Sequence, residues 1–157
     1  MQKSKIFIGV IGAGDCSEDV YKLAEEVGGK IAQAGAILIC GGLGGVMEAA
    51  SKGAKKEGGT TIGILPSVDK SHANSYIDFP IVTGLGEARN LLVIRNSDVV
   101  IALPGEYGTL SEIGFSLKLE KPIIGLFTWD VSEAIIKAKN AEEAVKIALS
   151  RVSKYDG

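Results

Sequence analysis

The sequence predicts a Rossmann-like α/β fold: a doubly wound parallel sheet of six or seven strands with helices on both faces. Two observations carry this prediction. Short runs of β-branched and apolar residues alternate with segments of helical periodicity along the whole chain. Each run is apolar throughout, as strands are when helices cover both faces of a parallel sheet. We expect residues 1–157 to form one domain, because the length suits a single core and no repeat is visible.

The predicted elements follow in regular order. Strands are expected at 6–11, 37–40, 60–65, 81–84, 99–103 and 123–127, with a short seventh at 134–137, and helices at about 18–34, 46–56, 87–96 and 109–119. Residues 67–79 form a polar segment between two strands. A last helix is expected after Asn140, which can cap it, with Glu143 completing a capping-box-like pair. Right-handed crossovers then place the binding crevice at the carboxyl edge of the sheet, where the strand order switches.

Composition excludes several classes of function. Seventeen basic and nineteen acidic residues give a net charge of −2 without a basic stripe, so no nucleic-acid partner is expected. No run is long enough to span a membrane. The first apolar run leads directly into glycines without a cleavage pattern, so we expect a cytoplasmic protein. Cys16 and Cys40 suggest neither a disulfide framework nor a metal site.

Three glycine-rich loops follow predicted strands. The first, with Gly12 and Gly14, is similar to a dinucleotide-binding loop, but Ser17 stands where the third glycine belongs. The second strand also lacks a terminal acidic residue, which makes a nicotinamide cofactor a weak hypothesis. These glycines serve either a tight turn or direct ligand contact. In the second loop, four glycines in five positions suit backbone amides packed against a ligand: Gly41, Gly42, Gly44 and Gly45.

The third loop is the most informative. Pro104, Gly105, Gly108 and Thr109 follow the strongest predicted strand and open a helix, so their amides and the helix dipole favour an anion. Thr109 can cap that helix and also bind a phosphate. Glu112 is expected in the first helical turn, either to favour the dipole or to act at the site.

Arg89 supplies the complementary charge. It is expected in the first turn of the helix after the fourth strand, as Glu112 is after the fifth. If those strands are neighbours, both side chains lie over one crevice, as a salt bridge or as a phosphate- or sugar-binding pair. His72 is expected at the surface, and Trp129 has no partner that would make it more than a packing residue.

These residues make the chain recognisable. The segments 41–66, 87–90, 97–98 and 104–112 resemble the superfamily of LONELY GUY cytokinin-activating enzymes and molybdenum-cofactor carrier proteins. The Pro-Gly-x-x-Gly-Thr-x-x-Glu string is specific to it. Its members have often been labelled lysine decarboxylases, which these residues do not support. In the hydrolase branch, the resemblance implies cleavage of the N-glycosidic bond of a nucleoside 5′-monophosphate. Arg89 and Glu112 then match the catalytic pair, and Gly105, Gly108 and Thr109 the phosphate loop.

The sequence departs from the hydrolase branch in ways that favour the carrier branch. Glu106 replaces the motif's second glycine, Asn90 replaces the lysine after the arginine, and Gly86 replaces a histidine. We therefore favour a binding or carrier protein for a phosphorylated nucleotide- or pterin-like molecule, with the molybdenum cofactor or a nucleoside monophosphate as ligand. The alternatives are a phosphoribohydrolase that uses Arg89 and Glu112, and a regulatory nucleotide sensor.

Residues 91–94 predict self-association. The run Leu-Leu-Val-Ile is apolar around the whole helix, which is more than one sheet-facing stripe would bury. We expect a homodimer or a larger even homo-oligomer.

Overall fold

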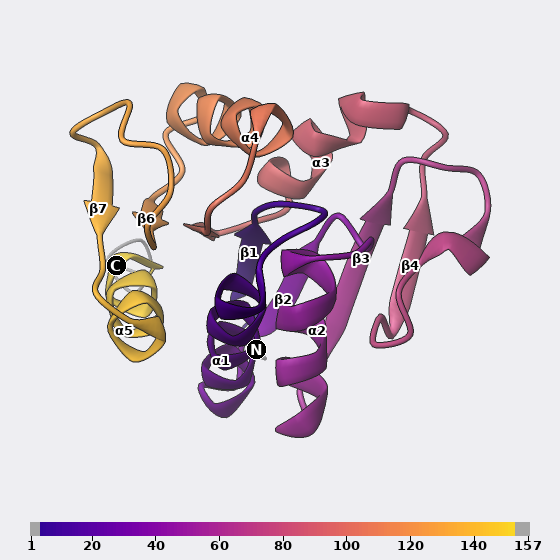
Figure 1. Ribbon diagram of the computed structural model, residues 1–157, viewed down its shortest axis with the longest axis horizontal. Coiled ribbons are helices and arrows are strands. Elements are labelled where there is room, and N and C mark those ends of the chain that lie inside the picture. The colour runs from indigo at the N-terminus through magenta and orange to yellow at the C-terminus, as the bar shows by residue number, and fades with distance from the viewer. Residues whose placement is uncertain (1–3, 153–157) are drawn as a thin grey trace.

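A computed structural model describes residues 4–152 and contains a seven-stranded parallel sheet, which confirms the predicted fold class (Figure 1). The strand order is β4-β3-β2-β1-β5-β6-β7. The strands are β1 (Phe7–Ile11), β2 (Ile37–Cys40), β3 (Thr61–Leu65), β4 (Phe79–Val82), β5 (Val99–Ala102), β6 (Ile123–Gly125) and β7 (Ile135–Lys137). The helices are α1 (Glu18–Gln33), α2 (Val46–Lys56), α3 (Asn90–Arg95), α4 (Tyr107–Lys118) and α5 (Ala141–Val152), with short 3₁₀ helices η1 (Lys70–His72) and η2 (Gly86–Arg89).

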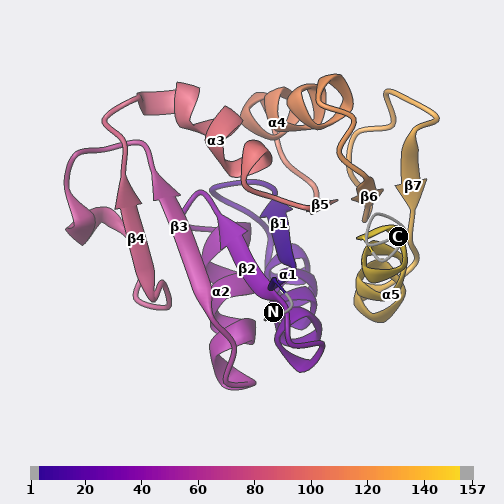
Figure 2. The same ribbon diagram turned by 180° about the vertical axis from the view of Figure 1, so that it is seen from behind.

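The helices cover both faces of the sheet. α1, α2 and α5 lie on the near face in Figure 1 and behind the sheet in Figure 2, where they close one apolar cluster around Val10, Leu38 and Ile101. α3 and α4 close a second apolar cluster around Ile11 and Ile123 on the other face. Burial of these aliphatic side chains on both sides explains why the central strands are apolar throughout.

The strand order reverses between β1 and β5, which lie side by side in the centre of the sheet. β1 pairs with β2 on one side and with β5 on the other, both in parallel register. The chain therefore winds outward in opposite directions from this pair. In open α/β sheets, the loops that leave such a switch point diverge and open a crevice at the carboxyl edge.

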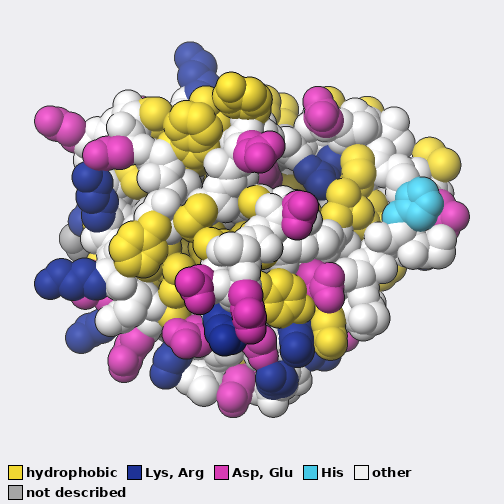
Figure 3. Space-filling model, viewed as in Figure 1, with side chains coloured by type: hydrophobic (Ala, Val, Ile, Leu, Met, Phe, Trp, Pro, Cys, Tyr) yellow, Lys and Arg dark blue, Asp and Glu magenta, His cyan; other side chains and the backbone are white. Residues whose placement is uncertain are grey.

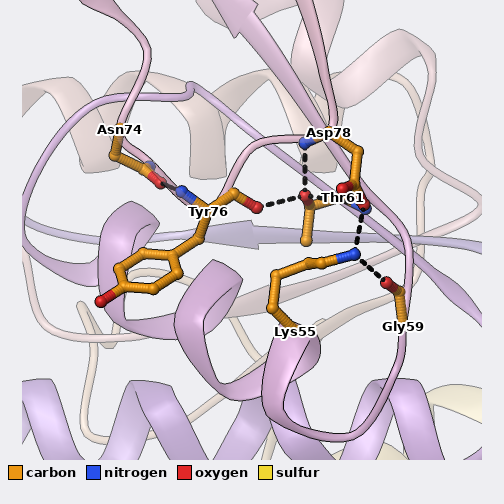
Figure 4. Close-up of polar contacts among 6 residues, drawn as sticks. All are labelled: Lys55, Gly59, Thr61, Asn74, Tyr76 and Asp78. Carbon is orange, nitrogen blue, oxygen red and sulfur yellow. Dashed lines mark hydrogen bonds and ion pairs between the residues drawn. The ribbon is translucent and has the colours of Figure 1, made fainter.

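The fourth strand begins two residues earlier than expected. The expected strand was 81–84, but β4 spans Phe79–Val82 and lies at the sheet edge, where Pro80 is tolerated. Its start is anchored by Asp78, whose carboxylate accepts hydrogen bonds from Lys55 Nζ at 2.9 Å and from the Thr61 amide at 3.0 Å (Figure 4). These bonds fix the register of β4 against β3 before the apolar run begins.

Two helix starts also differ from the expectation. The segment expected as one helix at 87–96 is a 3₁₀ helix that passes into α3 at Asn90, so Arg89 lies at the joint. The helix expected from residue 109 begins at Tyr107, with Glu106 at its N-cap position and no side-chain cap. Thr109 is therefore not the cap, and Glu112 lies in the second turn. Asn140 does cap α5: its Oδ1 accepts from the Glu143 amide at 2.8 Å.

No helix within residues 4–152 is both long and apolar enough to cross a lipid bilayer. On the face that Figure 3 shows, acidic and basic side chains are interspersed over α1 and α2, whereas hydrophobic side chains gather over α4.

Candidate functional site

A cavity of about 810 Å³ opens at the carboxyl edge of the sheet, beside the switch point. Its size is within the range of small-molecule sites. The residues predicted from the sequence that line it are Gly12, Gly14, Gly41, Arg89, Gly108, Thr109 and Glu112. The predicted residues that do not line it are Gly42, Gly44, Gly45, Pro104 and Gly105. Three loops that are distant in the sequence thus meet around one hollow.

The main chain of Ala13 joins these three loops. Its amide donates to the Pro104 carbonyl at 3.0 Å, and its carbonyl accepts from the Val46 amide at 2.9 Å. The first bond links the loop after β1 to the loop after β5. The second closes the start of α2, so the Val46 amide is not available to a ligand.

Packing accounts for some of the glycines. Gly42 and Gly45 have positive φ angles of 78° and 61°, which favour glycine. A Cβ on Gly105 would overlap the Thr109 hydroxyl. At Gly108, by contrast, an added Cβ would meet nothing within 4 Å. The absence of a side chain at Gly108 is not required by the fold, and it leaves space in the wall of the cavity.

The start of α4 presents free donors. Within residues 4–152, no protein acceptor takes the amide hydrogens of Glu106, Tyr107 or Gly108. Unpaired amides at a helix start, together with the helix dipole, favour an anion. The free amides of this loop suit an anion such as a phosphate group, and the helix begins two residues earlier than expected.

Arg89 is the only cationic side chain among the described cavity-lining residues, and it is 8% exposed. Its Nη1 donates to Asn90 Oδ1, and its Nη2 donates to the Gly41 carbonyl at 3.4 Å. Its buried Nε has no partner. Burial lowers the pKa of the guanidinium, although the Glu112 carboxyl opposes that shift. An unpaired buried donor is costly. The guanidinium charge lines the cavity and is only partly compensated by protein groups, so it favours an anionic ligand there.

Glu112 is 7% exposed and has the most perturbed carboxyl group of the site. Burial raises the pKa of Glu112 to about 8, and the nearby Arg89 charge opposes the shift without cancelling it. Among the described residues, no ion pair or hydrogen bond joins the two side chains. The pair is therefore not joined by the salt bridge that the sequence left open, and burial favours the protonated form of the Glu112 carboxyl.

Arg89 and Glu112 were expected over one crevice if the fourth and fifth strands were neighbours, and these strands are not neighbours. β3, β2 and β1 lie between β4 and β5. The two residues meet because η2 and α3 turn back over the sheet toward α4. Asn90 Nδ2 then donates to Ser111 Oγ at 3.3 Å, and Ser111 Oγ donates to the Gly108 carbonyl at 2.6 Å. These two hydrogen bonds connect Asn90, the neighbour of Arg89, to the start of α4.

Most of the polar rim of the cavity was not predicted from the sequence. Asp15, Glu87 and Glu106 are exposed and line the cavity, so its mouth is acidic. The rim was hidden because these residues come from three separate loops. Trp129 was also wrongly assigned to packing alone. Its Nε1 donates to the Gly105 carbonyl at 3.1 Å, and its ring stacks on Tyr107.

The fold and this cavity define a Rossmann-like protein with a large hollow at the switch point of its sheet. Residues 5–154 match the family model described as the SLOG cluster4 family, and the chain belongs to this family. The resemblance stated from the motifs is thereby confirmed.

Two solved structures are similar over nearly the whole chain. The molybdenum cofactor binding protein from Rippkaea orientalis has a TM-score of 0.88 and 39% identity, with 95% of this chain and 98% of that chain covered. The molybdenum cofactor carrier protein from Chlamydomonas reinhardtii has a TM-score of 0.85 and 36% identity, with 95% and 99% covered. A cytokinin riboside 5′-monophosphate phosphoribohydrolase of Mycobacterium tuberculosis is 36% identical over 71% of this chain. The alignment spans only 64% of that enzyme's length.

Proposed function

We propose that this protein binds and carries a phosphorylated pterin- or nucleotide-like molecule, with the molybdenum cofactor as the first candidate ligand. The observation that carries the proposal is the buried Arg89 guanidinium, the only cation among the described residues of the cavity wall, whose Nε has no partner. The free amides at the start of α4 supply further donors for a phosphate group. The similarity to two molybdenum-cofactor-binding proteins over nearly the full chain supports this choice of ligand.

A second candidate is the phosphoribohydrolase, which the mycobacterial relative favours. Cleavage of a glycosidic bond uses a carboxyl of raised pKa as general acid as well as an ionised carboxylate. Burial raises the pKa of Glu112 to about 8, which suits that acid and equally suits a neutral hydrogen-bond donor to a bound ligand. The similarity to molybdenum-cofactor-binding proteins over nearly the full chain, against partial coverage of the mycobacterial enzyme, favours binding over hydrolysis.

Mass spectrometry of small molecules that co-purify with the protein tests the proposal directly. We expect a pterin or nucleotide monophosphate to be released on denaturation, and ribose 5-phosphate release from AMP to remain at background. Rapid hydrolysis of AMP that is lost in Glu112→Ala would support the hydrolase instead.

We further propose that the protein acts in the cytoplasm without nucleic-acid or membrane partners.

Gly108→Ala is expected to weaken ligand binding without lowering the stability of the fold. The new methyl group meets no protein atom within 4 Å, and alanine favours a helix over glycine by up to about 1 kcal/mol. We expect an equal or higher free energy of unfolding, together with at least about tenfold weaker AMP binding, because the methyl group occupies the space left for the anion. Urea denaturation and calorimetry measure the two quantities.

Gly114→Ala is the matched control for this change. Gly114 lies in the same helix, also has open space around it, and does not line the cavity. It should show the gain in stability without the loss of affinity. Equal AMP affinity in all three proteins would remove Gly108 from the proposed site.

Glu106→Gly is expected to strengthen monophosphate binding. Glu106 has φ −101°, so the backbone there does not need the glycine that the family motif has at this position. What remains is electrostatic: an exposed carboxylate at the cavity mouth repels a phosphate dianion. We expect an increase in AMP affinity of about tenfold at low salt, measured by calorimetry, that shrinks as salt is added. Unchanged affinity would mean that the side chain turns away from the ligand.

We propose a homodimer or a larger even homo-oligomer that uses α3. Val93 and Ile94 are buried within the chain, but Leu91 and Leu92 remain half-buried on the surface. Light scattering at micromolar concentration should give at least twice the monomer mass, and Leu91→Asp should lower it. Val131→Asp changes an exposed apolar residue outside α3 and serves as the control. A stable wild-type monomer would contradict this proposal.

A further inference from the structure

We propose that Trp129 is a positioning residue for the loop at the start of α4, residues 104–109. It holds the Gly105–Glu106 peptide so that the Glu106 amide faces the bound anion. This inference rests on the proposed function, which assigns an anion to the start of α4. Arg89 independently points to an anionic ligand in the same cavity, because it is a buried cation of the cavity wall whose Nε has no partner.

The indole is fixed from two directions. Its Nε1 donates to the Gly105 carbonyl oxygen at 3.1 Å. Its ring stacks on Tyr107, with centroids 6.3 Å apart and an interplanar angle of 30°. Trp129 comes from the connection between β6 and β7, and is half-buried there. A tryptophan has one N–H donor, so this bond uses all of its hydrogen-bonding capacity on the loop.

Peptide geometry carries the effect from the carbonyl to the amide. Among the described residues no peptide bond is cis, and in a planar trans peptide the C=O and N–H groups point in opposite directions. Because the Gly105 carbonyl points toward the indole, the Glu106 amide must point away from it. That amide has no acceptor within residues 4–152, and Glu106 lines the cavity.

Glycine at position 105 makes this restraint necessary. A Cβ there would overlap the Thr109 hydroxyl, so packing demands glycine. Glycine, however, adopts positive as well as negative φ angles, which leaves the following peptide free to rotate. The bond from Trp129 selects the orientation in which the amide is available to an anion.

Trp129→Phe tests the inference, because phenylalanine keeps an aromatic ring beside Tyr107 and removes the N–H donor. Calorimetry with inorganic phosphate and with AMP should show affinity weakened by about five- to tenfold, the range expected for one misplaced donor. In ¹⁵N NMR spectra, phosphate should shift the Glu106 amide of the wild type and leave that of the variant nearly unchanged. The chain's only tryptophan gives a single indole N–H signal, whose slow exchange in the wild type reports the bond to Gly105.

Tyr21→Phe is the control, since it also removes one aromatic hydrogen bond, to Glu48, from a residue that does not line the cavity. It should leave phosphate affinity unchanged. The inference is supported if Trp129→Phe binds phosphate more weakly than the wild type while its melting temperature equals that of Tyr21→Phe. Equal affinity and an equal Glu106 shift in wild type and Trp129→Phe overturn it while leaving the anion site intact. A wild type that binds neither phosphate nor AMP overturns the proposed site, and the inference with it.

Discussion

Replacing Arg89 by methionine should weaken the binding of AMP or of the co-purified ligand by about 100-fold. Arg89 is the only cation among the described residues of the cavity wall, and it is desolvated there. Loss of one partner from a buried charged interaction costs about 2–5 kcal/mol, and 2.8 kcal/mol corresponds to about 100-fold. Calorimetry on the purified protein measures the change.

Stability should change little in the same variant. Burial already lowers the pKa of the guanidinium, which means that the fold holds this charge at a cost. Methionine fills a similar volume, and only the bonds to Asn90 and to the Gly41 carbonyl are lost. Arg95→Met, at the end of the following helix α3, exposed and outside the cavity, provides the matched control. If both variants bind equally well, Arg89 is not part of the binding site.

Wild-type protein should lose stability as the pH rises from about 5 to 8, and Glu112→Gln should lose much less. The pKa of Glu112 is raised from 4.5 to about 8 in the folded state, chiefly by burial. The folded protein therefore holds a proton that the unfolded chain releases in this range. The resulting stabilisation is complete below pH 4.5 and is lost as the pH rises through 8, by a few kcal/mol in total, on the order of magnitude that linkage gives.

Urea denaturation at several pH values measures this difference. Glutamine mimics the neutral carboxyl and cannot titrate, so its variant isolates the contribution of Glu112 from those of all other groups. Glu133→Gln makes the same chemical change at an exposed position and should follow the wild-type curve. Parallel curves for wild type and Glu112→Gln would show that this carboxyl is ionised throughout.

The sequence was sufficient to predict the architecture because each element is specified locally. Apolar β-branched runs marked the strands, and Asn140 with Glu143 marked the last helix. The strand order was harder, because pairing joins segments that are distant in the chain. β4 therefore proved to be separated from β5 by three strands, although the two follow one another in sequence.

The site was only partly predictable for the same reason. Arg89, Gly108, Thr109 and Glu112 stood out because they belong to short motifs. The partner of Trp129 lies 24 residues earlier in the chain, and no local pattern connects them. The protonation of Glu112 depends on how deeply three-dimensional packing buries it, which residue type and spacing do not encode.

The two hydrogen bonds of Ala13 have a consequence for mutagenesis. They unite the loops after β1, β2 and β5 through main-chain atoms alone, so every amino acid except proline supplies the same donor and acceptor. A side-chain scan at this position would report on the cavity that Ala13 lines and not on these two bonds. Damage would appear instead at Gly45, where a Cβ would collide with the Ala13 carbonyl. The connection between the three loops is thus protected from most point mutations at the residue that makes it.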